Sequence, residues 1–148
     1  MSYRIINPEE LGAPRGWNNG MLGPVGGRVL FIAGQTAHDH SGRVPKAGFV
    51  EQFGRALDNT LAVVRAAGGA PADIGRMTVF VTDVESYRGS LPELGELWRQ
   101  RMGRHFPAMA LMEVVRLVDE RALVEIEATA VLTGPASLQA DDAAPAAT

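Results

Sequence analysis

Two consecutive segments near the end of the chain constrain its fold most, because both alternate between residue types. The first is residues 107–114 (Pro-Ala-Met-Ala-Leu-Met-Glu-Val), and a short turn separates it from residues 124–131 (Val-Glu-Ile-Glu-Ala-Thr-Ala-Val). This alternation is typical of β-strands, whose successive side chains point to opposite faces of a sheet. One face of the pair is predicted to be apolar. The other is predicted to combine two large apolar residues with three acids: Met109, Leu111, Glu113, Glu125 and Glu127.

A mixed face of this kind is not expected to be fully solvated. Large apolar side chains left in water gain nothing from folding, and a carboxylate that is covered needs hydrogen-bonding partners. We therefore expect a ligand pocket or another copy of the chain to cover this face. Functional residues are expected there.

The composition limits the size and the partners of the fold. With 148 residues, of which 46% are hydrophobic, the chain can bury one core, and we expect a single domain over residues 1–134. Residues 135–148 are rich in Ala and Pro and have few large apolar groups, so we expect a mobile tail. A net charge of −3 argues against nucleic acid as a partner.

The residue types that the sequence lacks exclude further chemistries. The chain has no cysteine, which excludes disulfides, thiolate catalysis and sulfur-based metal sites. No apolar run approaches the length of a membrane span, and the polar start at residues 1–4 lacks the apolar core of a signal peptide. We therefore expect a cytoplasmic protein without a membrane partner.

The spacing of apolar residues predicts two helices. Apolar side chains recur at helical spacing over residues 49–67 and stop at Gly68-Gly69. A second stripe follows Ser90, which together with Glu93 has the form of a capping box, and it ends near Gly103.

Strands are predicted before and between these helices. Residues 3–6 and 76–82 have strand-like patterns, and Gly26-Gly27 predicts a hairpin turn between residues 21–25 and 28–35. Residues 28–35 are nearly continuously apolar, which predicts a central strand covered on both sides. A single sheet with both helices on one face fits this order, and self-association is the simplest way to cover the other face.

The chain resembles the reactive-intermediate deaminase (RidA/YjgF) family, whose members are also described as liver perchloric-acid-soluble protein-type endoribonucleases. The matching pieces appear in the family's order over residues 3–132. They are Asn7-Pro8, residues 31–35, residues 52–59, residues 66–68, residues 78–83, residues 106–108, Glu113-Val114 and residues 125–128.

The resemblance implies an α+β fold with a chorismate-mutase-like sheet and two helices on one face. It also implies a homotrimer around a central β-barrel, with a small-molecule ligand bound in clefts between subunits, and no cofactor or metal. Glu125 matches the family position that orients or activates the hydrolytic water, so the resemblance implies that it is catalytic. A carboxylate in a partly apolar cleft can act as a general base or acid.

Three positions depart from the family pattern. Hydrolysing members carry an arginine directly after Phe-Pro-Ala, where this chain has Met109, and a thioether cannot replace a guanidinium in binding a carboxylate. Trp17 stands where tyrosine is usual, and Ala33 stands where a serine often precedes the Gly-Gln pair. With Leu111 and Glu113, these are the candidate substrate-binding residues. The departures predict a substrate other than the carboxylate-bearing enamines.

Each candidate also has an ordinary structural interpretation. Met109 and Leu111 could pack a subunit interface, and Glu125 could pair with donors of a neighbouring chain. Trp17 could be either a pocket wall or a core anchor, and Asn18-Asn19 is predicted to shape a turn.

Two polar clusters are predicted to be structural. His38-Asp39-His40 has the residue types of a metal site but no further ligands nearby, so a solvated turn is expected. Arg99, Arg101 and Arg104 are expected to complement the dipole of the second helix, because they lie at its C-terminal end. As an RNA-binding surface the cluster is small and has few aromatic residues nearby.

Three functions follow in order of preference. The first is a RidA-like imine or enamine hydrolase whose substrate preference has moved away from carboxylate-bearing enamines. The second is a noncatalytic ligand-binding or regulatory trimer of the same fold. Endoribonuclease activity comes last, because the charge of the chain argues against it.

Overall fold

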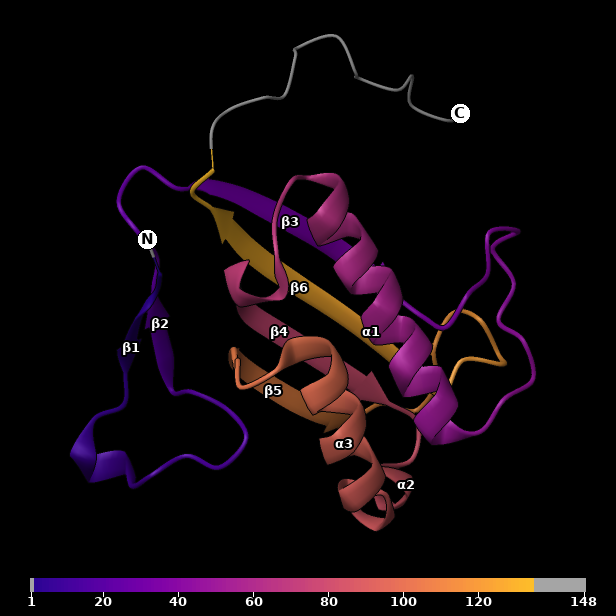
Figure 1. The fold of residues 1–148 in the computed structure, drawn as a ribbon. Helices are drawn as coiled ribbons and strands as arrows, with labels where there is room; N and C mark the ends of the chain where they lie inside the picture. Colours follow the sequence, from indigo (N-terminus) through magenta and orange to yellow (C-terminus); the bar gives the residue numbers. More distant parts are fainter. Residues whose placement is uncertain (1, 135–148) are drawn as a thin grey trace, which may run out of the picture.

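A four-stranded mixed sheet forms the centre of the molecule in the computed structural model, which describes residues 2–134 (Figure 1). The predicted tail at residues 135–148 lies outside the described residues. The strands are β1 (Arg4–Ile6), β2 (Gly20–Leu22), β3 (Arg28–Gln35), β4 (Ile74–Val81), β5 (Ala108–Glu113) and β6 (Val124–Leu132). The helices are α1 (Phe49–Ala66), α2 (Val84–Gly89) and α3 (Leu91–Met102), with 3₁₀ turns η1 (Glu9–Leu11) and η2 (Pro71–Asp73).

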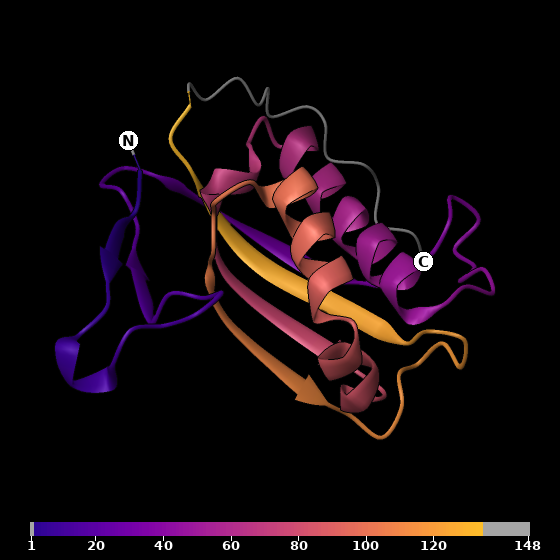
Figure 2. The same cartoon turned by 60° about the horizontal axis from the view of Figure 1, so that its bottom comes forward.

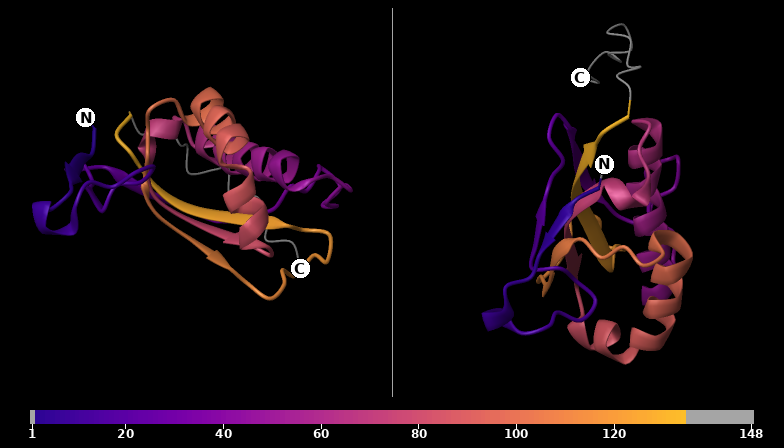
Figure 3. Two further views of the ribbon diagram at one scale, coloured as in Figure 1. Left: turned by 90° about the horizontal axis from the view of Figure 1, so that it is seen from below. Right: turned by 60° about the vertical axis from the view of Figure 1, so that its left-hand side comes forward.

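The strand order in the sheet is β3-β6-β4-β5. Strand β6 pairs antiparallel with both β3 and β4, whereas β4 and β5 are parallel. Both long helices lie on one face of this sheet, as the sequence predicts, and within residues 2–134 the other face carries no helix (Figures 2 and 3). None of the helices in residues 2–134 is both long and apolar enough to cross a membrane.

Helix α1 has the predicted bounds, because its apolar stripe supplies most of the contacts with the sheet. Phe53, Leu57 and Val64 are buried in the core against β6 and β3. The helix ends where Gly68 adopts a φ of +81°, a left-handed conformation that glycine adopts at low cost.

Helix α3 starts as predicted, but the expected capping box is absent. Ser90 precedes the first residue of α3, yet its side chain makes no capping hydrogen bond. Ser90 follows directly on α2, which the sequence analysis did not predict as a separate helix. The Ser90 backbone, with φ −116° and ψ 15°, is therefore not extended, and an N-cap normally requires an extended residue. Asp83 caps α2 by accepting a hydrogen bond from the Glu85 amide.

The predicted hairpin around Gly26-Gly27 is wrong. Strand β2 pairs with β1 in a separate two-stranded arm, and β3 pairs with β6. The arm projects beyond the end of the main sheet (Figures 1 and 2). A glycine pair permits a tight turn but does not select the partner strand, and here the turn at Gly26 only redirects the chain from the arm into the sheet.

The prediction that residues 28–35 form the central strand is also wrong, because β3 is an edge strand. Its inward side chain Ile32 is buried, whereas Val29 and Phe31 are 56% and 81% exposed on the helix-free face. The apolar run of β3 therefore arises from one buried side and one apolar side that stays exposed in a single copy of the chain.

The two strands that open the sequence analysis are separated in space by β4, and their faces differ from the prediction. Met109 and Leu111 are level with the buried Met77 and Val79 of β4, so they face the helices and pack against the core. Glu125 and Glu127 alternate with buried Val124 and Ile126, so they face the helix-free side. The reason for the error is the register of the parallel pair, which the periodicity of one strand cannot reveal.

Two amides on α1 hold neighbouring loops in place. The buried Gln52 side chain donates to the Arg121 carbonyl at 3.0 Å and accepts from the Leu123 amide at 2.9 Å. Asn59 donates to the carbonyls of Thr36 and His38 at 2.9 and 3.0 Å. The loops that flank β3 and β6 are thereby attached to the helix.

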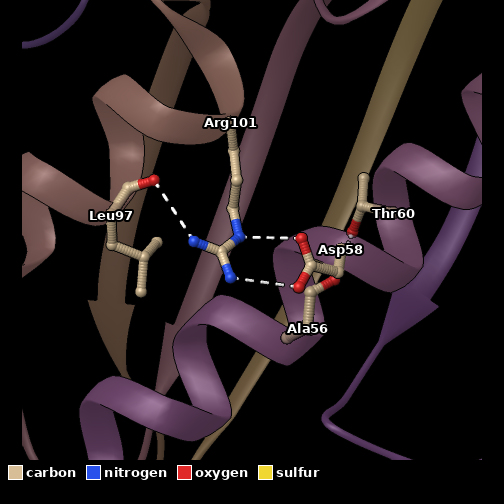
Figure 4. Close-up of polar contacts among 5 residues, drawn as sticks. All are labelled: Ala56, Asp58, Thr60, Leu97 and Arg101. Carbon is tan, nitrogen blue, oxygen red and sulfur yellow. Dashed lines mark hydrogen bonds and ion pairs between the residues drawn. The ribbon is translucent and has the colours of Figure 1, made fainter.

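Helices α1 and α3 are joined by a two-pronged ion pair (Figure 4). The Arg101 guanidinium donates to both carboxylate oxygens of Asp58, at 2.7 and 3.1 Å. Parallel N–H···O bonds of this kind fix orientation as well as separation. Arg101 therefore serves the contact between the helices, beyond the predicted complement to the helix dipole.

Tyr3 attaches the N-terminal arm to the main sheet. Its hydroxyl donates to the Asp73 carbonyl oxygen at 2.7 Å, and a Cβ added at Gly75 would lie 2.6 Å from that hydroxyl oxygen. Burial raises the pKa of the Tyr3 phenol above its ordinary value of 10.0, and the Asp73 charge adds to this, while the Val131 backbone opposes it. Only the neutral phenol can donate this bond.

Replacing Tyr3 with Phe tests this attachment. We expect Y3F to lower the free energy of unfolding by about 1 kcal/mol, the net value of one hydrogen bond. Because the pKa is raised in the folded state, the stabilisation is present below about pH 10 and is lost as the pH rises through the folded pKa. Urea unfolding at pH 8 and at pH 11 measures both effects. Equal stability of wild type and Y3F at pH 8, or a loss as large in the Y87F control, would contradict the assignment.

Candidate functional site

A pocket of about 270 Å³ lies between α3 and β5. Its walls are mainly apolar, as in most small-molecule sites. They include Leu94 and Trp98 from α3, Phe106 before β5, and Met109 and Leu111 from β5. The Trp98 and Phe106 rings stack with centroids 6.1 Å apart, and the Trp98 indole donates to the His105 carbonyl at 3.1 Å. The stacked pair gives the pocket a rigid aromatic wall.

The loop before β2 closes one side of the pocket. Gly16 lines the pocket, and Asn18 ties this loop to the start of β5. The Asn18 side chain donates to the Phe106 carbonyl at 2.6 Å, and its backbone amide donates to the Pro107 carbonyl at 3.1 Å. Asn7 donates to the Asn18 side chain at 2.8 Å. Asn18 therefore attaches its loop to the residues that precede β5, and these contacts position a wall of the pocket.

Met109 and Leu111 both line the pocket, but Trp17 is not among its lining residues. Trp17 is 43% exposed, and its indole donates to the Asn19 side chain at 3.4 Å. The alternative of a core anchor with a backbone acceptor is therefore wrong.

Glu113 has a structural partner. One carboxylate oxygen accepts a hydrogen bond from the Val84 backbone amide at 3.0 Å, at the first residue of α2. A carboxylate at a helix N-terminus interacts favourably with the exposed amides there. Glu113 therefore connects the end of β5 to the start of α2.

Glu125 and Ala33 lie on the other face of the sheet, away from the pocket. Glu125 is partly exposed on β6, and its carboxylate lies against Gly34, where any Cβ would overlap it. Within residues 2–134, no hydrogen bond or ion pair involves this carboxylate, whereas Glu127 lies 3.9 Å from Arg76. Ala33 is exposed beside Gly34. The Glu125 carboxylate is therefore available to accept a hydrogen bond or a proton from a ligand or a water molecule.

The predicted solvated turn at His38-Asp39-His40 agrees with the structure. Asp39 accepts hydrogen bonds from the Ser41 hydroxyl at 2.6 Å and from the Arg43 amide at 3.1 Å. These donors, the Ser41 hydroxyl above all, lower the pKa of Asp39 to about 2. No group of three or more potential metal ligands occurs in the described part of the chain.

Four of the six predicted site residues fall into two groups within one copy of the chain. Met109 and Leu111 line the pocket, whereas Glu125 lies against Gly34 and Ala33 is the residue before it. Trp17 and Glu113 belong to neither group. The sequence analysis did not identify Phe53, Leu94 or Trp98 as pocket residues. Their helical spacing predicted core positions, and only the pairing of β5 with β4 places a cavity next to them.

Comparison with known proteins identifies the family. Residues 10–132 match the family model described as Endoribonuclease L-PSP. A RutC family protein of Pyrococcus horikoshii is 33% identical over 70% of this chain and 79% of its own length. The human 2-iminobutanoate/2-iminopropanoate deaminase is 30% identical over 70% of this chain and 73% of its own length.

A solved structure has the same fold. The crystal structure of the Rid family protein YyfB from Yersinia pestis superposes with a TM-score of 0.77 at 31% identity, covering 89% of this chain and all of that one. The family match spans the sheet, all three helices and both groups of candidate residues. The chain belongs to the RidA/YjgF family of reactive-intermediate deaminases, the family whose model is described as Endoribonuclease L-PSP.

Proposed function

We propose that this protein is a RidA-like hydrolase that releases ammonia or an amine from an unstable imine or enamine. Glu125 is the observation that carries the proposal. It is partly exposed, it lies against Gly34, and its carboxylate has no partner within residues 2–134. A carboxylate that is not committed to a structural bond can accept a proton from water as the water attacks the C=N carbon.

The site is proposed to form between copies of the chain. In one copy the pocket beneath α3 and the Glu125 carboxylate are on opposite faces of the sheet, so one copy cannot bring both to a single ligand. The β3 edge of a neighbouring copy, where Glu125 lies against Gly34, is proposed to meet the β5 edge of this copy and to bring the Glu125 carboxylate to the mouth of the pocket. A homotrimer with the sheets around a central barrel, as expected from the family resemblance, has such interfaces.

Exposed apolar side chains support this assembly. Phe31 and Val29 on β3 and Met112 on β5 all lie on the helix-free face and are exposed in one copy. Val29 and Phe31 are neighbours on one face of β3, and contiguous exposed apolar side chains usually mark an interaction surface, whereas Met112 lies at the opposite edge of the sheet. Both outer strands of the sheet, β3 and β5, also have one unpaired edge.

The substrate is proposed to differ from those of relatives with an arginine after Phe-Pro-Ala. Met109 occupies that position and lines the pocket with Leu111 and Phe106. This region of the pocket therefore offers dispersion contacts in place of a charge-assisted hydrogen bond. An uncharged substrate, or one anchored elsewhere, fits this lining.

The second candidate is a noncatalytic ligand-binding or regulatory trimer. It is favoured by Met109 and Ala33, which provide no polar group to orient a reacting substrate. Endoribonuclease activity is the least favoured candidate. Arg101, from the basic cluster, is committed to Asp58, and the net charge of −3 opposes RNA binding.

Glu125→Gln tests the catalytic proposal. We expect amine release to fall by about ten- to a thousandfold, the usual range for loss of a general base, because the amide cannot take a proton from water. Amine release from a panel of imines and enamines, with and without carboxylates, measures the effect. Glu127→Gln is the matched control on the same strand and face, and we expect it to retain the wild-type rate. Turnover that is unchanged in E125Q would exclude the mechanism, and wild-type binding without turnover would favour the second candidate.

Phe31→Asp tests the assembly. Burial of a Phe side chain contributes about 1.5–3 kcal/mol, so a charge in its place should weaken association at least about tenfold. Sedimentation velocity at micromolar concentration should then show a smaller species than wild type. Val118→Asp is the control, because Val118 is fully exposed in the loop between β5 and β6. A wild-type protein that is monomeric under these conditions would refute the shared site.

Met109→Arg tests whether position 109 sets the substrate preference. We expect this variant to gain turnover of carboxylate-bearing imines, because a guanidinium in the pocket can bind the carboxylate through two hydrogen bonds. The same amine-release panel measures the gain relative to wild type. Leu111→Arg, two residues along the same face of β5, controls for a charge placed elsewhere in the pocket. An equal gain in both variants would show that position 109 is not special.

A further inference from the structure

Few polar side chains reach the pocket beneath α3, and one of them is uncharged and uncommitted. Arg99 and Arg104 line the pocket as exposed residues, so their guanidinium groups can stay hydrated at its edge. The indole N–H of Trp98 is bonded to the His105 carbonyl. Among the described lining residues, the remaining polar side chain is that of Tyr87 on α2.

The Tyr87 hydroxyl is accessible to a ligand. The Tyr87 ring packs against the core, but within residues 2–134 its hydroxyl takes part in no hydrogen bond. The hydroxyl of Tyr3, the other tyrosine of the chain, donates to the Asp73 carbonyl. Of the side-chain oxygens and nitrogens in the described residues, Thr78 Oγ1 alone is both buried and unpartnered. The unpartnered Tyr87 hydroxyl is therefore not closed off by the protein.

Helix α2 is held so that Tyr87 keeps its position relative to β5. The Glu113 carboxylate at the end of β5 accepts a hydrogen bond from the Val84 amide at 3.0 Å, at the first residue of α2. Tyr87 lies about one helical turn after Val84. Met109 and Leu111, which line the pocket, belong to the same strand as Glu113. Glu113 is therefore a positioning residue that fixes the polar group of the pocket relative to its apolar wall.

A single hydroxyl in an apolar pocket matches a particular class of ligand. An uncharged imine has one strongly polar atom, the C=N nitrogen, which accepts a hydrogen bond. In small-molecule sites the apolar walls supply the contact area, and a few polar groups fix the orientation. A phenol hydroxyl can donate to such a neutral acceptor, whereas a guanidinium is better matched to an anion.

We propose that the Tyr87 hydroxyl donates a hydrogen bond to the C=N nitrogen of an uncharged imine whose aryl or branched alkyl body packs against Met109 and Leu111. This inference rests on the function proposed above and names the substrate class of that site, imines of ketones or aldehydes that carry no carboxylate. Tyr87 selects and orients the substrate, and Glu125 of a neighbouring copy acts on the water.

Binding of stable analogues to the full-length chain tests Tyr87 independently of turnover. The first probe is 4-phenyl-2-butanone, whose carbonyl oxygen replaces the imine nitrogen as the acceptor. The second is its methylidene analogue, in which a CH₂ group replaces that oxygen and cannot accept the bond. Protein labelled with ¹³C at the methionine methyl groups reports binding, because Met109 lines the pocket and Met112 on the opposite face serves as an internal reference.

We expect Y87F to lower the affinity for the ketone about two- to tenfold, the effect of losing one hydrogen bond. The affinity for the methylidene analogue should stay unchanged, which also shows that the pocket remains folded. Tyr3→Phe is the matched control, because it removes a hydroxyl outside the pocket and should alter neither affinity. Equal losses for both probes in Y87F, or no loss for either, would overturn the inference. A ketone-selective loss in R99Q or R104Q, with none in Y87F, would also overturn it.

The outcomes separate this inference from the catalytic proposal. A ketone-selective loss in Y87F together with unchanged turnover in E125Q would support the role of Tyr87 and reject only the mechanism assigned to Glu125. Reduced turnover in E125Q without a ketone-selective loss in Y87F would retain that mechanism and reject the role of Tyr87. No Met109 shift with either probe would overturn the placement of ligand in this pocket, and with it the role of Tyr87.

Discussion

The attachment of α1 and α3 to one face of the sheet is the constraint on which the other features depend. Along β6, Val124, Ile126 and Ala130 are fully covered by this packing, whereas Glu125 between the first two stays partly open. One side of β6 thus faces the protein interior, and its other side belongs to a surface that a single copy leaves uncovered. The burial of those three side chains supplies stability, and the acid that alternates with them is available for chemistry.

Most secondary-structure elements could be predicted from the sequence, because their signals are local. The stripe over residues 49–67 and the alternation over residues 124–131 each report one element and the direction of its apolar side. The family resemblance also predicted how the elements are arranged, because its motifs occur along the whole sheet. The pairing of the strands could not be predicted. Gly26-Gly27 permits a hairpin between β2 and β3, but β2 pairs with β1. Pairing depends on contacts between segments far apart in sequence, to which local periodicity is insensitive.

The same limit explains the errors at the candidate site. Met109 and Leu111 were expected beside Glu125 because all three belong to alternating strands, but β4 lies between those strands. The register of β5 against β4 turns Met109 and Leu111 toward the helices, whereas Glu125 faces away from them. The pocket then arises from α3, β5 and a loop of the N-terminal segment, a combination that no single motif encodes. Trp98 shows the consequence most clearly. Its helical spacing marks it as a core residue, and only the tertiary structure brings Phe106 and Met109 beside it as walls of a pocket.

The way in which Asn18 holds its loop has a consequence for how the site can diversify. Asn18 bonds to the main-chain oxygens of Phe106 and Pro107, groups that every residue type would present at those positions. The attachment of the loop is thereby independent of the side chain at position 106, which is a wall of the pocket. Mutation can exchange the ring at that position without removing these bonds, so the pocket can acquire new selectivity while its framework stays constant.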